Sequence, residues 1–436
     1  MKVFKFGGAS VKDAQAVRNV ARILENYSNE RIFIVVSAMG KTTNMLEQIL
    51  HDCFEGRDHT ERLAALKEYQ IGIFKELFPA SAIRNNDIRL MGDMLKVIDD
   101  TPKGDVMNHD FDMFYDLIVP IGEHFAAYIL TLYLNLYLEN SQLIDAEDWV
   151  KTDNYSRSAN VDIVLTTKKL QYIMAQYPDT RIFITEGFIG STIDGLPTTL
   201  GREGSDYTAA LAASILKAES LTVWKDVAGL FNADPKRMPD AQKINTLSYK
   251  EAVELAYYGA KIIHPKTIKP IENSNIPLYI KSFLHPEAEG TLICREAETE
   301  TTLPFFIFHE NQILVSISVK DLSFITEKNL RYIFNVIHRC RIHVRLMQNS
   351  AISFSICVDN DPVRCKQLIN LLSKNYIILY NDGLELITVR HYQHSDLNAL
   401  LTNKEILLEQ RSRTTAQFVV RNSTTRQNDS HTDKIN

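Results

Sequence analysis

The sequence predicts an α/β protein in which helices cover a mainly parallel sheet. The first reason is the β-branched run at residues 31–36, which suits a buried parallel strand and ends in a turn. The second is that further strand-like runs, at 181–185 and 221–225, flank a helical segment at about 206–217. Strands that alternate with helices are typical of layered α/β folds.

The chain opens with a βα unit. Residues 2–6 are strand-like, Gly7 and Gly8 form a turn, and residues 13–26 have the apolar spacing of a helix. Two glycines after a strand let backbone N–H groups approach a phosphate, and the charge of Lys5 favours an anion. From the glycines alone, a plain tight turn is an equally good interpretation.

A second turn follows the strand at 31–36. Residues 37–44 imitate the end of a P-loop, but Val35 stands where that motif needs its first glycine, so a Walker A loop is not expected. Small hydroxyl-bearing residues such as Ser37 and Thr43 still suit a carboxylate or a phosphate.

Three charged patches could hold a substrate. Glu123 precedes an apolar helical run, where it could cap the helix or bind an ammonium group. Arg202 lies in a glycine-rich turn and can hold a carboxylate through two hydrogen bonds, whereas the nearby Asp206 could simply be a helix cap. The third patch, residues 224–236, suits the edge of a nucleotide, although Asp234 before a proline is also ordinary turn chemistry.

The character of the chain changes after about residue 296, where the charged segment EAETETT is typical of a linker. Short strands and helices then follow in the ferredoxin-like order βαββαβ. A weaker second copy stops before its second helix, and the polar tail is expected to be disordered. The predicted domains are 1–295, a first repeat at 296–384, a truncated second repeat at 385–422, and a tail at 423–436.

Composition argues against several classes of protein. A net charge of -6 without a basic face argues against nucleic-acid binding. No uncharged apolar run approaches the length of a membrane span, and the N-terminus lacks the features of a signal peptide. The five cysteines are scattered and lack metal-binding spacing, which predicts reduced thiols in a cytoplasmic protein.

Each patch is weak alone, but the combination is specific. Seven motifs follow one another: KFGGAS, VVSAMGKTTN, GE, TEGFIG, TTLGREGSDYTAA, WKDVAGLFNADPK and GAKIIHP. In this order they resemble the aspartate kinase family of the amino-acid-kinase superfamily, over nearly the whole chain. The resemblance implies a three-layer αβα amino-acid-kinase (carbamate-kinase-like) domain, followed by paired ferredoxin-like ACT domains.

The resemblance also implies an activity. Members of this family use ATP and Mg²⁺ to phosphorylate the side-chain carboxylate of L-aspartate directly, in the first step of lysine, threonine and methionine biosynthesis. The products are 4-phospho-L-aspartate and ADP. Catalysis is then a matter of positioning and of neutralising charge around the transferred phosphoryl group. The acceptor carboxylate needs no general base, because it is already ionised at neutral pH.

By the same resemblance, individual residues receive roles. Lys5 neutralises the phosphates, and Asp206 orients that lysine. Glu123 pairs with the α-ammonium group of the substrate, and Arg202 with its α-carboxylate. The other expected substrate-site residues are Thr43 and Ser205. The residues expected to frame the nucleotide are Lys5, Gly7, Gly8, Ser37, Lys225, Asp226, Phe231, Asp234, Lys236, Lys261 and Ile262. No protein ligand for a metal is expected.

The sequence departs from the family pattern at several positions. Phe231 stands where tyrosine is common and keeps an aromatic face for stacking. Lys236 stands where arginine is common and keeps one positive charge. In the C-terminal half, the glycine that commonly precedes the first ACT helix is missing. Two interpretations stay open there: an amino-acid sensor at residues 347–350, or a dimerisation module with weak or absent feedback. A homodimer is expected under both.

Three alternative functions are less favoured. A glutamate or acetylglutamate kinase does not fit the GREGSDYTA stretch and the ACT tail. A catalytically inactive amino-acid sensor has no physical need to keep Lys5, Glu123, Arg202 and Asp206 together. A fusion with homoserine dehydrogenase is not expected, because no dinucleotide fingerprint follows, and the chain is therefore expected to be monofunctional.

Overall fold

The computed structural model describes residues 1–79, 85–99, 111–138, 140–260, 263–295, 297, 303–321 and 323–422. The chain divides into two compact units, each with its own sheet. The first unit contains Met1–Leu230, Lys243–Ala256 and Lys261–Glu298. The second unit contains Phe231–Gln242, Tyr257–Ala260 and Thr299–Asn436.

The first unit is built on an eight-stranded sheet with the order β10-β12-β11-β7-β1-β2-β4-β3. Its strands are β1 (Lys2–Phe6), β2 (Ile32–Val36), β3 (Ser141–Leu143), β4 (Ile182–Glu186), β7 (Ser220–Lys225), β10 (Thr246–Ser248), β11 (Leu278–Ser282) and β12 (Thr291–Cys294). All neighbours are parallel except the pair β11 and β12. The strands predicted at 2–6, 31–36, 181–185 and 221–225 are therefore confirmed.

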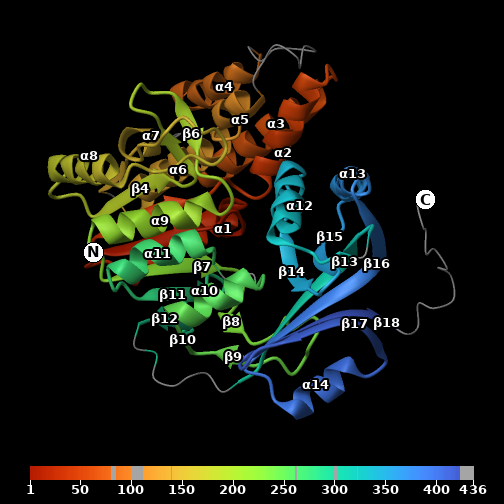
Figure 1. Ribbon diagram of the computed structural model, residues 1–436. Coiled ribbons are helices and arrows are strands. Elements are labelled where there is room, and N and C mark those ends of the chain that lie inside the picture. Colours follow the sequence, from red (N-terminus) through yellow and green to blue (C-terminus); the bar gives the residue numbers. More distant parts are fainter. Residues whose placement is uncertain are drawn as a thin grey trace. The chain divides into compact units, whose positions relative to one another are not determined.

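Helices cover both faces of this sheet, which confirms the predicted three-layer αβα arrangement (Figure 1). One face carries α9 (Gly204–Ile215), which crosses β1, β2 and β7, and its neighbours α8 (Ile163–Gln176) and α11 (Pro265–Asn273). The other face carries α1 (Ala14–Glu25) and α6 (Ile121–Tyr137), with α2 (Thr42–Phe54), α3 (Thr60–Leu77), α4 (Asn85–Asp99) and α5 (Phe111–Ile118) outside them. Shorter elements are α7 (Ala146–Trp149), α10 (Tyr249–Tyr257), β5 (Ile189–Ser191), β6 (Pro197–Thr199), β8 (Leu230–Phe231) and β9 (Lys243–Ile244).

Among the described residues, one helical segment, Phe111–Tyr137, passes the test for a membrane span by length and composition, and it includes α6. It is long and apolar enough to cross a membrane, but 78% of its most apolar window is buried inside the protein. In the core, α6 packs with α1 and α2 against side chains of β1 and β2 such as Phe6 and Ile34. The stretch therefore behaves as a core helix.

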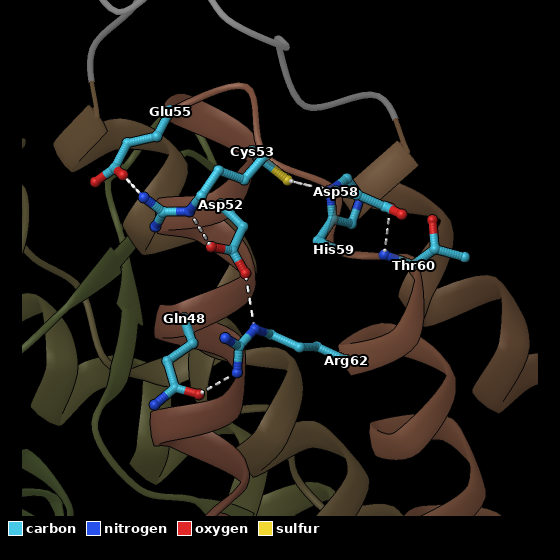
Figure 2. A network of polar contacts seen from close by, with 9 residues as sticks. Gln48, Asp52, Cys53, Glu55, Asp58, His59, Thr60 and Arg62 are labelled. Carbon is cyan, nitrogen blue, oxygen red and sulfur yellow. Dashed lines mark hydrogen bonds and ion pairs between the residues drawn. The ribbon is translucent and has the colours of Figure 1, made fainter.

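A buried acid holds the corner between α2 and α3 (Figure 2). Asp52 accepts hydrogen bonds from Nε of Arg57 at 2.7 Å and from Nε of Arg62 at 2.8 Å. Arg62 also donates to Oε1 of Gln48 at 3.1 Å. The hydrogen bond from Arg57 is the largest cause that keeps the pKa of Asp52 below its ordinary value. This network steadies α2, whose first turn carries Thr43.

The second unit is an antiparallel six-stranded sheet with the order β14-β15-β13-β16-β18-β17. Its elements are β13 (Phe305–Val319), α12 (Glu327–Arg339), β14 (Val344–Asn349), β15 (Ser353–Asp359), α13 (Pro362–Leu372), β16 (Tyr376–Arg390), α14 (His394–Leu401), β17 (Lys404–Arg411) and β18 (Thr415–Asn422). The βαββαβ order of the first repeat agrees with the sequence expectation.

The two repeats share their long strands. The predicted boundary between the repeats falls between residues 384 and 385, but the structure has one strand across it, β16, with a register shift opposite Gln312. Residues 305–309 pair with 386–390, so the second repeat gains a fourth strand from the first part of β13, which lies inside the predicted first repeat. That pairing joins residues about eighty positions apart, beyond the reach of local patterns. The domain boundaries themselves stay predictions, and the tail at 423–436 lies outside the described residues.

Candidate active site

Four parallel strands of the first sheet end at one edge, and polar turns follow them. β1 is followed by Gly7 and Gly8, β2 by Ser37, β4 by Gly187 and β7 by Asp226. The chain adds β2 and β4 on one side of β1 and β7 on the other, so the direction of winding reverses at β1. Crevices at the carboxyl ends of strands beside such a reversal are the usual ligand sites of open α/β sheets.

The glycine turn after β1 is tightly packed at one of its two glycines. Gly8 begins a short 3-10 helix, and its carbonyl accepts a hydrogen bond from the N–H of Gly40 at 3.0 Å. A Cβ at Gly8 would lie 2.6 Å from the carbonyl oxygen of Ala38, which no side chain tolerates. A Cβ at Gly7 would meet only Nζ of Lys5, at 3.5 Å. Gly8 is therefore required by the meeting of the two turns.

A pocket of about 480 Å³ opens at this edge of the sheet. It is lined by Lys5, Ser37, Thr43, Glu47, Tyr115, Glu123, Arg157, Phe188, Gly201, Arg202, Glu203, Gly204, Ser205 and Asp206. The structure thus brings together all the residues predicted to bind substrate, together with Lys5, Ser37 and Asp206. Such a concave site with convergent polar groups is the default location for binding and catalysis.

A buried ion pair occupies the side of the pocket next to β1. Nζ of Lys5 lies 2.7 Å from Oδ1 of Asp206, and both side chains are largely shielded from solvent. Burial by itself would raise the pKa of Asp206, but the charges of Lys5 and Lys225 outweigh it and the pKa lies below its ordinary value. Asp206 is the third residue of α9, and Glu203 takes the N-cap position, so Asp206 is not the helix cap.

Glu123 is a buried acid that makes no ion pair with another described residue, although the charges of His124 and Lys5 act on it. It lies in the first turn of α6, where Pro120 is the N-cap, and its Oε2 has no hydrogen-bond partner among the described residues. Burial raises the pKa of Glu123 to about 8, although a hydrogen bond from the backbone of Ala38 opposes the shift. Gly122 permits this close approach, because a Cβ there would lie 2.9 Å from Cγ2 of Thr42. An ammonium group of a ligand would complete this site.

Arg202 is exposed and, within the described part of the chain, makes no ion pair. It follows Gly201, whose φ of +77 favours glycine. Ser205 is buried behind it, and a Cβ on Gly187 would collide with the Ser205 side chain at 2.4 Å. A free guanidinium at the mouth of a pocket can bind a carboxylate through two hydrogen bonds.

Comparison with known proteins places the chain in a family. The model of the amino acid kinase family matches residues 1–282. The chain belongs to the amino acid kinase family. It is 29% identical over 395 residues to lysine-sensitive aspartokinase 3 of Escherichia coli K12, covering 89% of this chain and 86% of the relative.

Two further comparisons extend this result. A crystal structure of E. coli aspartokinase III in complex with aspartate and ADP (R-state) matches with a TM-score of 0.80 and 27% identity, covering 98% of this chain and 97% of that one. The bifunctional aspartokinase/homoserine dehydrogenase 1 of Arabidopsis thaliana is 33% identical over 307 residues, which is 68% of this chain. The chain spans only about a third of the length of such plant relatives, 33% in this case. The predicted fold class is confirmed, including a C-terminal antiparallel sheet consistent with ACT-like repeats.

Apart from Lys5, Gly7, Gly8 and Ser37, the predicted nucleotide residues of this amino acid kinase fall into three groups. Lys225 and Asp226 end β7 in the first unit, and burial lowers the pKa of Lys225 despite the nearby charge of Asp206. Phe231, Asp234 and Lys236 belong to the second unit, where Oδ1 of Asp234 accepts the N–H of Lys236 at 2.9 Å in a local turn. Lys261 and Ile262 lie outside the described residues.

Besides Gly201, Glu203 and Gly204, which flank Arg202 in its turn, four pocket residues of the kinase domain were not predicted: Glu47, Tyr115, Arg157 and Phe188. Phe188 lies inside the TEGFIG motif, so the sequence contained a pattern that could have identified it as a site residue. Glu47 follows Thr43 by one helical turn on α2, a spacing that places both on one helix face. Tyr115 and Arg157 carry no local signal, because no turn glycine or strand end precedes them.

Proposed function

We propose that this amino acid kinase is an aspartate kinase, which transfers the γ-phosphoryl group of ATP to the side-chain carboxylate of L-aspartate. The observation that carries the proposal is one pocket beside Lys5 with a buried acid, Glu123, and an arginine, Arg202, neither of which makes an ion pair among the described residues. These groups match the α-ammonium and the α-carboxylate of an amino acid. The E. coli relative whose structure holds aspartate and ADP supports the same assignment.

The proposed mechanism relies on positioning and on charge. The acceptor carboxylate is ionised at neutral pH and attacks the γ-phosphorus without a general base. Lys5 offsets the charge of the phosphates, and Asp206, 2.7 Å from Nζ, holds the lysine in place. Backbone N–H groups of the Gly7–Gly8 turn are suited to donate to phosphate oxygens. Thr43 and Ser205 provide hydroxyl groups on the acceptor side.

Mg²⁺ fits this pocket as a partner of the nucleotide. Among the described residues, no group of three or more His, Cys, Asp or Glu side chains could hold a metal ion. Mg²⁺ commonly binds through substrate phosphates and water with only one or two protein carboxylates, so the donor set is compatible with an ion that arrives with ATP. Such an ion would neutralise negative charge on the phosphates.

Purified protein with ATP and Mg²⁺ tests the proposal in a hydroxylamine assay, which traps an acyl phosphate as a hydroxamate. L-Aspartate and L-glutamate are compared side by side, with a Lys5→Ala variant as the control for contaminating kinases. We expect turnover with aspartate and little with glutamate. Equal turnover of the two acids would refute the substrate assignment, and no turnover of either would refute the activity.

For the C-terminal unit we propose a pair of ACT-like repeats that joins two copies of the chain in a cytoplasmic homodimer. The relative whose name calls it lysine-sensitive supports regulation by an amino acid, and we propose a sensor at residues 347–350 as one form of it. Light scattering tests the dimer. Repeating the hydroxamate assay with lysine, threonine or methionine separates a sensor from a purely structural module, because only a sensor makes the rate respond.

A further inference from the structure

We propose that Arg157 is a second carboxylate-binding residue of the acceptor pocket, which holds the α-carboxylate of the amino acid together with Arg202. This inference deepens the proposed function and rests on it. Arg157 lines the same pocket as Arg202, Glu123 and Lys5. Arg157 would add a group that recognises the substrate, and it lies outside the sequence motifs.

The backbone of Arg157 is fixed by a buried acid. Its N–H lies 3.1 Å from each carboxylate oxygen of Asp116, and Oδ1 of Asp116 also accepts a hydrogen bond from the Thr199 hydroxyl at 2.6 Å. Arg157 has a φ of +63, an unusual backbone conformation for a residue with a side chain. Strain of this kind persists where the surroundings hold it, and it clusters at functional sites.

The guanidinium of Arg157 is also held in place. Nη1 donates to Oδ1 of Asp112 at 3.0 Å, and the guanidinium carbon lies 4.4 Å from the centre of the Tyr115 ring. The Tyr115 hydroxyl donates in turn to Oε1 of Glu47 at 2.7 Å. Glu47, Tyr115 and Arg157 all line the pocket, so this chain of contacts forms one continuous polar wall. A guanidinium has five donors, and among the described residues Asp112 accepts from Nη1, so the donors of the other nitrogens can serve a ligand.

Arg157 and Arg202 lie on adjoining loops, and they differ in how far other residues hold the side chain in place before a ligand binds. A Cβ on Gly201 would lie 3.1 Å from the carbonyl oxygen of Arg157, so the loop that carries Arg202 packs directly against Arg157. Arg202 has no ion-pair partner among the described residues and loses side-chain freedom when it binds. Arg157 is already ordered by Asp112 and Tyr115. A guanidinium that is already ordered, next to the loop of a second one without an ion-pair partner among the described residues, suits a carboxylate that must be held while the other carboxylate of the substrate reacts.

Two acceptors that differ only in this group test the inference. β-Alanine has the carbon skeleton, the amino group and the reacting carboxylate of aspartate, but it lacks the α-carboxylate. The experiment measures kcat/KM for both, or the competitive inhibition constant where turnover is too slow, in wild-type protein and in Arg157→Gln. We expect Arg157→Gln to weaken aspartate by about tenfold or more, as for a lost charge-assisted hydrogen bond, and to leave β-alanine within about twofold.

Arg18→Gln is the matched control. Arg18 also makes a surface ion pair at 3.0 Å, to Glu76, and is similarly exposed, at 36% against 42% for Arg157. It lies on α1 and does not line the pocket, so it should change neither substrate. Asp112→Asn should weaken aspartate by a smaller factor than Arg157→Gln, because the guanidinium remains.

Several outcomes would overturn the inference. An Arg157→Gln variant that weakens aspartate and β-alanine equally would show a purely structural role, and one with unchanged aspartate kinetics would show no role. Failure of the proposed function is separate, because it would appear as a wild-type protein that does not phosphorylate aspartate. Wild-type turnover with an unaffected variant would refute only the role of Arg157.

Discussion

The two ends of the acceptor pocket contain buried acids in opposite states. At one end Asp206 is 5% exposed, pairs with Lys5, and has a lowered pKa. At the other end Glu123 is 4% exposed, has an oxygen without a partner in the described structure, and has its pKa raised to about 8. Burial is nearly identical, so the difference arises from the neighbouring cations. The end at Asp206, called the compensated end, has its charge balanced by Lys5 of the protein itself. The end at Glu123, called the uncompensated end, needs the ammonium group of a ligand to balance its charge.

The largest expected effect follows from breaking the compensated end. We expect Lys5→Ala to lower kcat by about 10²–10³-fold, because it removes a preorganised charge beside the phosphates. It also leaves Lys225 as the one cation known among the described residues to act on Asp206, so the free energy of unfolding should fall. Steady-state kinetics and chemical denaturation measure the two effects.

A double variant separates these effects. Lys5→Ala with Asp206→Asn removes the stranded charge, so stability should recover while kcat stays low. Near-normal turnover in Lys5→Ala would contradict the role of the lysine. Recovery of activity in the double variant would show that the loss came from damage to the fold.

Neutralising the other end should have the opposite effect on stability. We expect Glu123→Gln to raise KM for aspartate by roughly 10–100-fold, since it removes a charged hydrogen-bond acceptor for the ammonium group. The free energy of unfolding should stay equal or rise, because a buried carboxylate without a cation is removed. If Glu123→Gln lost as much stability as Lys5→Ala, the proposed difference between the two ends of the pocket would be wrong.

The raised pKa of Glu123 also predicts a pH dependence. The ordinary pKa is 4.5 and the folded value is about 8, so the folded protein binds the extra proton between these limits. Stability therefore falls as pH rises from about 4.5 to 8. Binding of aspartate needs the ionised form of Glu123. The KM for aspartate should therefore fall by about tenfold for each unit by which pH rises toward 8, and should stay constant at higher pH. Kinetics at saturating ATP check this slope, which Glu123→Gln should flatten.

Sequence patterns predicted the compensated end better than the uncompensated one. Lys5, the glycine turn and the strand 31–36 are local features, and Asp13 caps α1 where the sequence places the helix start. The charged state of Glu123 depends on what surrounds it in space, so no local pattern contains it. The same holds for Arg157, whose partners Asp112 and Tyr115 lie more than forty residues away. In the second unit, the strand at 305–309 escaped prediction for the same reason.

The glycine turn beside Lys5 offers a finer test within one dipeptide. Gly8→Ala should lower the free energy of unfolding by about 1–3 kcal/mol and raise KM for ATP, since the new Cβ would overlap the Ala38 carbonyl. Gly7→Ala should change stability by less than about 0.5 kcal/mol, because Gly7 has a φ of -76 and only Lys5 nearby. Thermal unfolding and ATP titration of both variants measure the difference. Equal effects would mean that the turn packs differently.

The smallest expected effect concerns His124, the neighbour of Glu123, whose charge is compensated. Its Nδ1 lies 3.2 Å from Oε1 of Glu186 and its Nε2 lies 3.8 Å from Oε1 of Glu147. Burial alone would lower the pKa of His124, but Glu186, with Asp145 and Glu147 around it, raises the pKa to about 9. A raised histidine pKa stabilises the fold fully below pH 6.5, and this contribution disappears as pH rises through 9.

His124→Gln keeps a hydrogen-bond donor and removes the proton. We expect the variant to be less stable than wild type by about 1–2 kcal/mol below pH 6.5 and to match it above pH 9. Aspartate kinetics should change by less than about threefold, because His124 does not line the pocket. Denaturation curves at pH 6, 7, 8 and 9 measure the difference between the two proteins, and the same pair of curves with Glu123→Gln in both proteins removes the contribution of Glu123, whose pKa the charge of His124 lowers. If the free energies of unfolding of the two proteins differ by the same amount at all four pH values, His124 is not charged in the folded protein. Asp206 would then be the buried acid at this edge of the sheet whose charge is balanced by a cation.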